Sequence, residues 1–181
     1  HRFKRGYKNV IDEAIRLNEA GVNAPLAIET SGHAALRENY FLDDGAYLVT
    51  RIIIEAVRLK KAGKPLLSLI EDLHTAKESL EVRLSFNTPD WKNLGAFVIE
   101  NMKKTKNRDL IVAPDNYEGV RVSIPKFKGW FLIRMSVHDP IMPINIESDL
   151  NGGAVKIAEI LYAYLSAFGG LNCSNLEKIV K

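Results

Sequence analysis

An alternation of apolar and polar residues in the second half of the chain is the feature that most restricts its fold. From Leu80 to Phe86 every second residue is apolar, a period typical of a strand with one buried face. Three further strand candidates lie close together, at residues 119–124, 129–137 and 142–147. Their links are short and contain proline or glycine, so we expect hairpins and an antiparallel sheet.

Two expected helices complete this half of the chain. Residues 91–104 follow the first strand, and the strongly apolar residues 151–168 come after the last one. The second of these helices must pack on the sheet to bury its apolar surface. The order of strand, helix, three strands and helix predicts an α+β unit, with a four-stranded antiparallel sheet and helices on one face.

The first half is α/β in character but incomplete. Hydrophobic spacing and turn residues predict a helix, a strand and two more helices, at residues 10–21, 25–30, 46–62 and 65–73. Asp43 or Asp44 can cap the start of the second helix. A single strand cannot form a sheet, so we expect an α/β partial domain. The break between the halves is expected near residues 74–78.

Composition excludes several classes of protein. The 181 residues are 46% hydrophobic and 26% charged, which excludes general disorder. The formal net charge of +3 is too small to indicate a nucleic-acid partner. Cys173 is the only cysteine and cannot form an internal disulfide. No apolar run approaches the roughly 18 residues of a membrane span, so no membrane partner is expected.

The start of the chain, HRFKRGYKN, has neither an initiator methionine nor an apolar signal region. We therefore expect the chain to be a piece of a longer protein. Internal repeats and low-complexity segments do not stand out in the sequence.

The first candidate binding motif is ETSGH, residues 29–33. Because side chains alternate along a strand and Gly32 allows a sharp turn, we expect Glu29, Ser31 and His33 to project together at the end of the short strand. Their carboxylate, hydroxyl and imidazole offer the donors and acceptors that suit sugar hydroxyls. The same groups occur in Ser-His-acid hydrolases, but the G-x-S-x-G nucleophile elbow is missing. The structural alternative is that Glu29 caps a turn and His33 is a loop histidine with satisfied hydrogen bonds.

The second candidate motif is IRMSVHDP, residues 133–140. Arg134 and Ser136 are expected on one face of a strand that runs into a proline-terminated loop. A guanidinium, a hydroxyl and loop N–H groups together suit a phosphate monoester. The alternative is an arginine on the solvated face of the sheet. His138 and Asp139 lack a third nearby ligand, so no metal site is predicted in this chain.

Two basic clusters allow a functional and an ordinary interpretation. KRGYK places Lys4 and Lys8 around Gly6, where a lysine can meet a phosphate or transfer a proton. The alternative is surface charge. The cluster KKTKNR ends an expected helix at residues 103–108, where the helix dipole favours cations. Aromatic residues are not interleaved there, so nucleic-acid binding is not expected.

In combination, these motifs resemble the C-terminal part of the α-D-phosphohexomutases, the phosphoglucomutase and phosphomannomutase family. The resemblance rests on ETSGH, ENYFLDDGAY and IRMSVHDPIMPINIES, and it covers essentially the whole chain. It implies that residues 1–73 are the later part of the family's third domain, which is α/β and binds sugar. It implies that residues 76–181 are the fourth domain, a phosphate-binding α+β domain with a TATA-box-binding-protein-like fold.

The resemblance also implies the activity of the full-length protein, an isomerase that acts as an intramolecular phosphotransferase. In that family a phosphoserine in the first domain donates its phosphoryl group to a hexose phosphate. A bisphosphorylated intermediate of the glucose 1,6-bisphosphate type then returns the other phosphoryl group. Mg²⁺, held by an Asp-rich loop of the second domain, assists the transfer. Binding loops matter greatly here, because phosphoryl transfer depends mainly on positioning and charge stabilisation.

The family's functional residues can be carried over to this sequence. The contacts to the sugar hydroxyls fall on Glu29, Ser31 and His33. Binding of the phosphate that is not reacting is assigned to the loop residues Arg134, Ser136, Val137 and His138. Lys4 matches a lysine that some members place near the transferring phosphate, whereas other members carry it two places after the glycine, at Lys8.

The chain departs from the family pattern at two points. The usual R-x-S-G-T-E-P loop reads R-M-S-V-H-D-P from Arg134 to Pro140, which leaves the choice of sugar phosphate open. The sequence contains neither a serine loop of the T-A-S-H-N-P type nor a D-G-D-x-D metal loop. The chain alone is therefore expected to be inactive as a mutase.

The hypothesis from the sequence is the C-terminal portion of a cytoplasmic phosphohexomutase. Its partners would be a hexose phosphate and the missing first and second domains of the same polypeptide. The alternative is a stand-alone, non-catalytic phospholigand-binding or interaction module. Because the opening strands of the third domain are missing, we expect residues 1–73 to be the less stable half, with an exposed sheet edge or a partner covering it.

Overall fold

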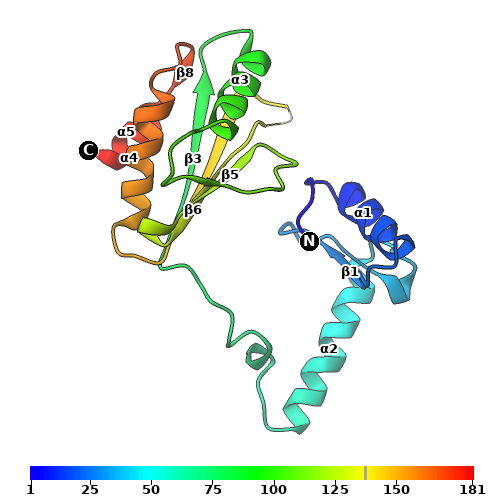
Figure 1. The fold of residues 1–181 in the computed structure, drawn as a ribbon. Helices are drawn as coiled ribbons and strands as arrows, with labels where there is room; N and C mark the ends of the chain where they lie inside the picture. The colour runs from blue at the N-terminus through cyan, green and yellow to red at the C-terminus, as the bar shows by residue number, and fades with distance from the viewer. Residues whose placement is uncertain (137) are drawn as a thin grey trace. The chain divides into compact units, whose positions relative to one another are not determined.

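The computed structural model describes residues 1–136 and 138–181. The chain divides into two units, His1–His74 and Thr75–Lys181, each of which is described by itself (Figure 1). The assignment of these units to two domains of a mutase stays a prediction. Among the helices of the described residues, none is long and apolar enough to cross a membrane.

The sheet of the second unit is antiparallel in all its described pairings and has the strand order β4-β5-β6-β7-β3-β8. Its four long strands are β3 (Glu78–Phe86), β5 (Val120–Ile124), β6 (Gly129–Ile133) and β7 (Ile141–Ser148). Two-residue strands close the edges, β4 (Ile111–Val112) and β8 (Leu171–Asn172). The expected antiparallel sheet is confirmed, with two short edge strands added. The finer likeness to TATA-box-binding proteins stays a prediction.

One face of this sheet carries the main hydrophobic core. Val82 of β3 pairs with Ile144 of β7, and Ile144 also pairs with Ile133 of β6. These three side chains share a face and are all buried. The same alternation gives buried residues at every second position of β5. The apolar period of two in the sequence follows from the burial of this single face.

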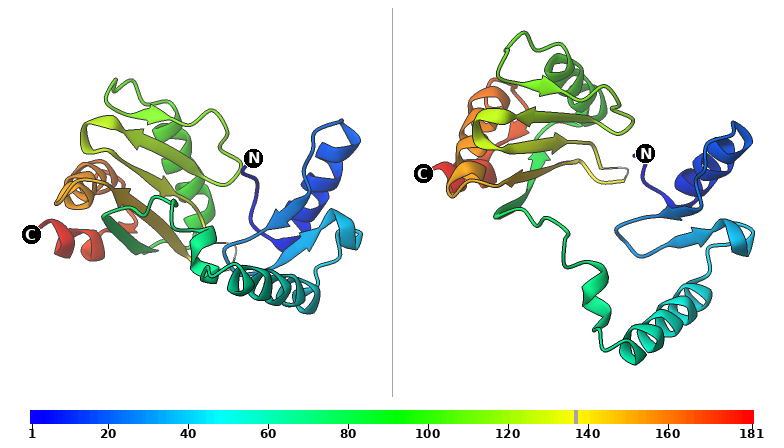
Figure 2. Two further views of the ribbon diagram at one scale, coloured as in Figure 1. Left: turned by 90° about the horizontal axis from the view of Figure 1, so that it is seen from below. Right: turned by 60° about the horizontal axis from the view of Figure 1, so that its bottom comes forward.

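Three helices pack on the core side of the sheet (Figures 1 and 2): α3 (Trp91–Lys103), α4 (Gly153–Leu165) and α5 (Ser174–Val180). Val98, Ile157 and Leu176, one from each helix, belong to the same buried cluster as the strand residues. The hydroxyl of Tyr164 on α4 donates a hydrogen bond of 2.9 Å to the carbonyl of Val98 on α3. Helices on one face of the sheet, as the sequence predicts, therefore enclose the core.

A side chain distant in sequence caps the N-terminus of α4. Glu78, the first residue of β3, accepts hydrogen bonds from the backbone N–H groups of Ala154 at 2.9 Å and Gly152 at 2.5 Å. These two donors, Ala154 first, favour the ionised carboxylate and hold the pKa of Glu78 below its ordinary value. Glu78 thus ties the start of the helix to the sheet.

The first unit contains a small two-stranded sheet. Strand β1 (Leu26–Ile28) pairs antiparallel with β2 (Ala34–Leu36), α1 (Tyr7–Glu19) precedes them, and α2 (Gly45–Lys61) follows. Short 3-10 turns lie at η1 (Arg37–Asn39) and η2 (Leu66–Leu69). The core of this unit is a cluster of three small residues, Ala14, Ala27 and Ala35.

Three expectations for the chain need correction. The first half has two strands instead of one, because residues 34–36 pair with residues 26–28. The short helix expected at residues 65–73 is only the 3-10 turn η2. The strand expected at residues 129–137 ends at Ile133. One expectation is confirmed: Asp44 caps α2 by accepting a hydrogen bond of 3.0 Å from the N–H group of Tyr47.

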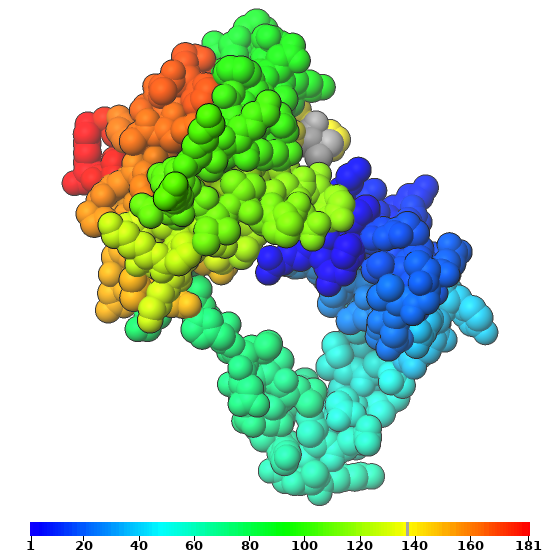
Figure 3. Space-filling model, in the orientation of Figure 1, coloured from blue at the N-terminus to red at the C-terminus, as the bar shows by residue number. Residues whose placement is uncertain are grey.

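Helix α2 carries a large apolar surface. None of its residues, all of which the structure describes, is buried. Ile52, Ile53 and Ile54 are 44%, 57% and 51% exposed, and Figure 3 shows the helix in cyan at the molecular surface. A helix that is apolar on several sides is typical of the interior of a larger core. This surface therefore agrees with a partial α/β domain.

Candidate functional site

The ETSGH motif forms the turn between β1 and β2. The N–H group of Glu29 donates to the carbonyl of His33 at 2.9 Å, and the N–H group of Gly32 donates to the carbonyl of Glu29 at 3.0 Å. Gly32 has a φ of +96°, a value that glycine adopts at low cost. The expectation that a strand aligns Glu29, Ser31 and His33 on one face is therefore wrong. The three residues lie instead in the tight turn between the two strands, at the glycine where the sequence allows one.

The carboxylate of Glu29 has a structural contact. Its Oε1 atom accepts a hydrogen bond of 2.6 Å from the N–H group of Gly6, the N-cap residue of α1. This contact agrees with the structural alternative, in which Glu29 serves as a cap. An ionised carboxylate has about four acceptor positions, so the Oε2 side retains capacity for a ligand hydroxyl.

His33 is held by two neighbours of the same unit. Its Nδ1 atom lies 2.7 Å from Oδ2 of Asp43, and its ring stacks on that of Tyr7 with the centroids 5.3 Å apart. These contacts fix the plane of the imidazole and engage one nitrogen. The side chain is still half exposed. Because Nδ1 faces the carboxylate of Asp43, the Nε2 atom on the other edge of the ring is directed away from it.

The arrangement around His33 does not support a Ser-His-acid hydrolase. The acidic partner of His33 is Asp43, a residue outside the ETSGH motif. No hydrogen bond joins Ser31 to His33 within the part of the chain that the structure describes, and Ser31 is exposed. The motif is therefore arranged as a set of donors and acceptors at the tip of a hairpin.

The two candidate lysines lie in different local structures. Lys4 belongs to the segment before α1, whereas Lys8 lies in the first turn of that helix. Both are exposed. Gly6, between them, has a φ of +109° and donates its N–H group to Glu29. Glu29 thus connects the KRGYK segment to the ETSGH turn.

The IRMSVHDP motif leaves the sheet at Arg134. Its backbone still pairs with β7 on one side, since Arg134 N–H donates to Pro143 at 3.2 Å and Ser136 N–H donates to Ile141 at 3.1 Å. On the other side β5 begins only at Val120, because Gly119 has a φ of +88°. Arg134 and Ser136 therefore lie on an extension of β6 that is paired on one side only, where both residues are half-buried.

The hydrogen-bond donors that this segment can offer a ligand come mainly from side chains, and less from backbone amides. The amides of Arg134 and Ser136 are used in pairing with β7. The Oγ atom of Ser136 accepts a hydrogen bond of 3.3 Å from the N–H group of Asp139, so its own hydrogen can be donated elsewhere. His138 is exposed in the loop that follows. Val137, which the resemblance places among the phosphate ligands, lies outside the described residues.

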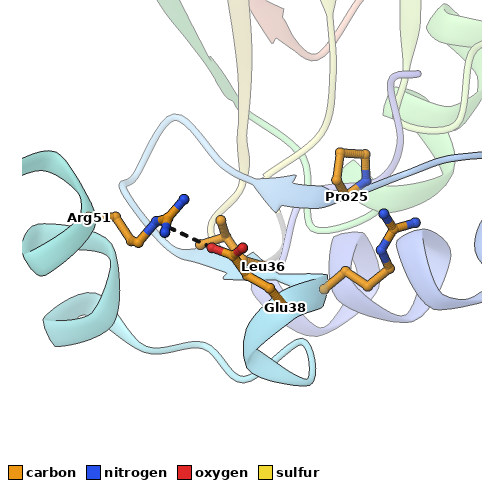
Figure 4. Close-up of a pocket in the computed structure, with 5 residues that line it drawn as sticks. Pro25, Leu36, Glu38 and Arg51 are labelled. Atoms are coloured by element: carbon orange, nitrogen blue, oxygen red, sulfur yellow. Dashed lines mark ion pairs between the residues drawn. The ribbon is translucent and has the colours of Figure 1, made fainter. Parts of the chain in front are cut away.

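A separate hollow of about 440 Å³ occurs in the first unit (Figure 4), lined by Pro25, Leu36, Arg37, Glu38 and Arg51. Figure 4 shows Arg51 and Glu38 pointing toward each other, with Nε and Oε1 3.3 Å apart. Arg37 donates to the amide oxygens of Asn18 and Asn23, each at 2.8 Å. Neighbouring side chains engage both guanidinium groups, so the hollow is not organised as an anion site. Of these residues only Glu38 belongs to a motif singled out in the sequence, at the start of ENYFLDDGAY, and packing brings the others to it.

Groups with metal-binding character are dispersed. Within residues 1–136 and 138–181, no three His, Cys, Asp or Glu side chains gather in an arrangement that could hold a metal ion. The basic cluster after α3 has an ordinary role, since Lys103 pairs with Glu100 at 2.8 Å near the end of the helix. The two motifs whose side chains could bind a ligand are therefore the ETSGH turn and the segment from Arg134 to Ser136.

The fold defines a class: an incomplete α/β unit followed by an α+β unit with an antiparallel sheet. The structure is similar to the crystal structure of a phosphoglucomutase/phosphomannomutase family protein from Burkholderia thailandensis, with a TM-score of 0.68 and 26% sequence identity. The match covers 94% of this chain and 33% of that protein, so the chain spans about a third of its structural relative. No protein-family model matches the sequence, and no curated protein matches it. The similarity supports the resemblance to the phosphohexomutases over both units.

Proposed function

We propose that this chain is the C-terminal portion of a phosphohexomutase that interconverts hexose 1-phosphate and hexose 6-phosphate through a phosphoserine enzyme. The similarity to a phosphoglucomutase/phosphomannomutase family protein supports the family, and the coverage of a third of that protein supports a portion of a longer enzyme. In this proposal the first unit contacts the sugar and the second unit binds the phosphate that is not reacting.

The observation that supports the phosphate role is the one-sided extension of β6. Arg134 and Ser136 stand on a segment whose backbone is paired on one side only, and the Ser136 hydroxyl retains a hydrogen to donate. A planar guanidinium and a hydroxyl suit the oxygens of a phosphate monoester. His138 adds a donor from the next turn, and Val137 is proposed to contribute its backbone amide. Binding the remote phosphate aligns the sugar for the reaction.

The sugar role falls to the hairpin tip of the first unit. Glu29 offers the carboxylate oxygen that does not face Gly6, Ser31 offers an exposed hydroxyl, and His33 offers Nε2. Acceptors and donors in this mixture suit vicinal hydroxyl groups. Lys4 is proposed to approach the transferring phosphate, with Lys8 as the alternative position.

The catalytic centre belongs to parts of the enzyme that this chain does not contain. The phosphoserine and the Asp-rich loop for Mg²⁺ are proposed to lie in the first and second domains of the same polypeptide. Mg²⁺ supplies charge stabilisation to phosphoryl transfer when it is bound there. A coupled assay for glucose 6-phosphate should therefore detect no mutase activity in the 181-residue chain, with or without Mg²⁺ and glucose 1,6-bisphosphate.

An amide NMR titration of the chain tests the binding roles. Glucose 1-phosphate and inorganic phosphate should both shift the amides of Arg134, Ser136 and His138. Only glucose 1-phosphate should also shift the amides of residues 29–33, and glucose alone should shift neither set. Shifts confined to other regions, or no response at millimolar ligand, would count against both binding roles in this chain.

A pair of arginine variants separates a specific site from general charge attraction. Arg134→Gln should weaken phosphate binding by about 2 to 4 kcal/mol, the scale of a lost charged contact. Arg83→Gln is the matched control, because Arg83 is an exposed arginine of β3 that pairs with Glu81. Equal losses in the two variants would show that phosphate responds only to the net charge of the protein.

A further inference from the structure

Met135 differs from the two residues that flank it. Arg134 and Ser136 belong to the proposed phosphate site, whereas the side chain of Met135 packs against the hydrophobic core of the second unit. One residue of the motif is thus anchored inside the unit.

The anchor point on α3 is a glycine. Gly95 lies in the interior of that helix and is buried, although glycine lowers helix stability relative to alanine. A Cβ atom on Gly95 would lie 2.0 Å from Sδ and 2.4 Å from Cε of Met135, and 3.2 Å from Cζ of Phe86. The first two distances are far below any van der Waals contact. The end of the Met135 side chain therefore fills the space that a side chain on α3 would take.

We propose that Gly95 and Met135 are positioning residues for the phosphate site, because their contact sets the course of the Arg134–Ser136 segment. The inference rests on the proposed function, since Arg134 and Ser136 are its phosphate ligands. Hydrogen bonds to β7 hold the segment by its backbone on one side. The Met135 contact holds the segment from the side of α3, so that the guanidinium and the hydroxyl keep one separation and direction.

An added methyl group at position 95 disturbs this arrangement in a defined way. The end of the Met135 side chain must move aside, and because Met135 is half-buried and packs against the core, part of this displacement is expected to pass to its backbone. A shift in the backbone of residues 134–136 would misplace Arg134 and Ser136, and a misplacement of about 1 Å can weaken binding substantially. Gly95→Ala should weaken the binding of inorganic phosphate on the order of tenfold while the pattern of β7 amide signals is retained.

The test uses the 181-residue chain and a double-mutant cycle. Gly95→Ala, Met135→Ala and the double variant are each titrated with inorganic phosphate, and the amide shifts of residues 134–136 are also compared without ligand. In the Met135→Ala background the two closest atoms are gone, and only Cζ of Phe86 stays near the added methyl group, at 3.2 Å. Gly95→Ala should therefore change affinity and ligand-free shifts much less in that background than with Met135 present. A merely helical effect of alanine would act equally in both backgrounds.

Gly169→Ala is the matched control within the same unit. Gly169 has open space around its Cβ position and an ordinary φ, so this substitution should leave phosphate binding unchanged. Should Gly95→Ala fail to fold, Met135→Leu carries the test, because it removes the long thioether and leaves α3 intact. Met135→Leu should then weaken phosphate binding several-fold.

The outcomes distinguish this inference from the proposed function. If the unsubstituted chain does not bind phosphate, the proposed function fails. The positioning contact is then tested by the amide shifts of residues 134–136 in the variants without ligand. A folded Gly95→Ala chain with unchanged shifts at residues 134–136 and unchanged phosphate affinity overturns the inference. Equal effects of Gly95→Ala in the two backgrounds, with Met135 present and with Met135 replaced by alanine, overturn it as well.

Discussion

The carboxylate of Glu29 accepts a hydrogen bond of 2.6 Å from the backbone N–H group of Gly6. One contact thereby joins the start of α1 to the tip of the β1–β2 hairpin, and it places the KRGYK and ETSGH motifs next to each other. A residue proposed for sugar binding thus also maintains the fold of its unit. The two roles can be separated, because the fold uses Oε1 and the ligand would use Oε2.

We expect Glu29→Ala to destabilise the first unit by about 1 kcal/mol, the usual scale of a lost cap. Glu29→Gln should retain most of this stability, because an amide oxygen can still accept from Gly6. Amide exchange in the first turn of α1 measures the effect. Glu71→Ala, at an exposed glutamate of the same unit, is the control and should change nothing. Identical exchange in the Glu29 variants and the original chain would contradict a capping role.

Gly119→Ala should destabilise the second unit by roughly 2 to 4 kcal/mol, from the sum of backbone strain and overpacking. The φ of Gly119 is +88°, and an added Cβ would lie 2.0 Å from the carbonyl oxygen of Ile133. Urea unfolding measures the loss. Gly152→Ala is the matched control, since Gly152 has a φ of +75° and open space at the Cβ position. That variant should lose only about 1 kcal/mol, and equal losses would exclude the close contact as a cause.

Protonation of Glu78 should destabilise the second unit in acid. Its N–H donors lower the pKa in the folded state, so the stabilisation is complete above the unfolded-state pKa of about 4.3. It is lost as the pH falls through the lower, folded-state pKa. Urea unfolding of Glu78→Gln from pH 7 to pH 3 should show a smaller loss than the original chain. Glu81→Gln, at an exposed position of β3, should keep the original pH profile, and a common profile for all three chains would refute the prediction.

Hydrogen exchange should find the first unit less protected than the second in a dilute solution of the chain. The first unit has a two-stranded sheet, a core of three alanines and the exposed isoleucines of α2. Strand β7, in contrast, is paired on both sides. Amides of β1 and β2 should therefore exchange faster than those of β7. Equal protection in the two units would contradict the prediction.

The long strands could be predicted from the sequence because burial of one face imposes a visible period. Met142, Ile144 and Ile146 alternate along β7 and all are buried. The short strands could not, since two or three residues carry no period. Ala34 and Ala35 of β2 also belong to a residue type with little preference for strands. Their pairing with β1 follows the turn at Gly32, which the sequence allows without indicating that a second strand comes after it.

The candidate site was predictable in its residue types but not in its geometry. The motif ETSGH pointed to Glu29, Ser31 and His33, whose role in binding stays a prediction, and the turn expected at Gly32 rather than the strand period describes where they lie. The partners of these side chains, Gly6 and Asp43, lie at other points of the sequence. Nothing in the sequence around Gly95 indicated a role in the candidate site. Its importance comes from the thioether of Met135, which only the folded chain brings to the same place.

The position of β3 inside its sheet has a consequence for the order of folding. Glu78, at the start of β3, pairs with Ser148, at the end of β7. During synthesis β3 leaves the ribosome before β7. The pairing of β3 with β7, which is its longest, can therefore form only after β7 has been made. Pairing over such a distance along the chain is slow compared with local hairpin formation. A nascent chain that ends before residue 148 would therefore expose the apolar face of β3, and we expect chaperones to protect that intermediate.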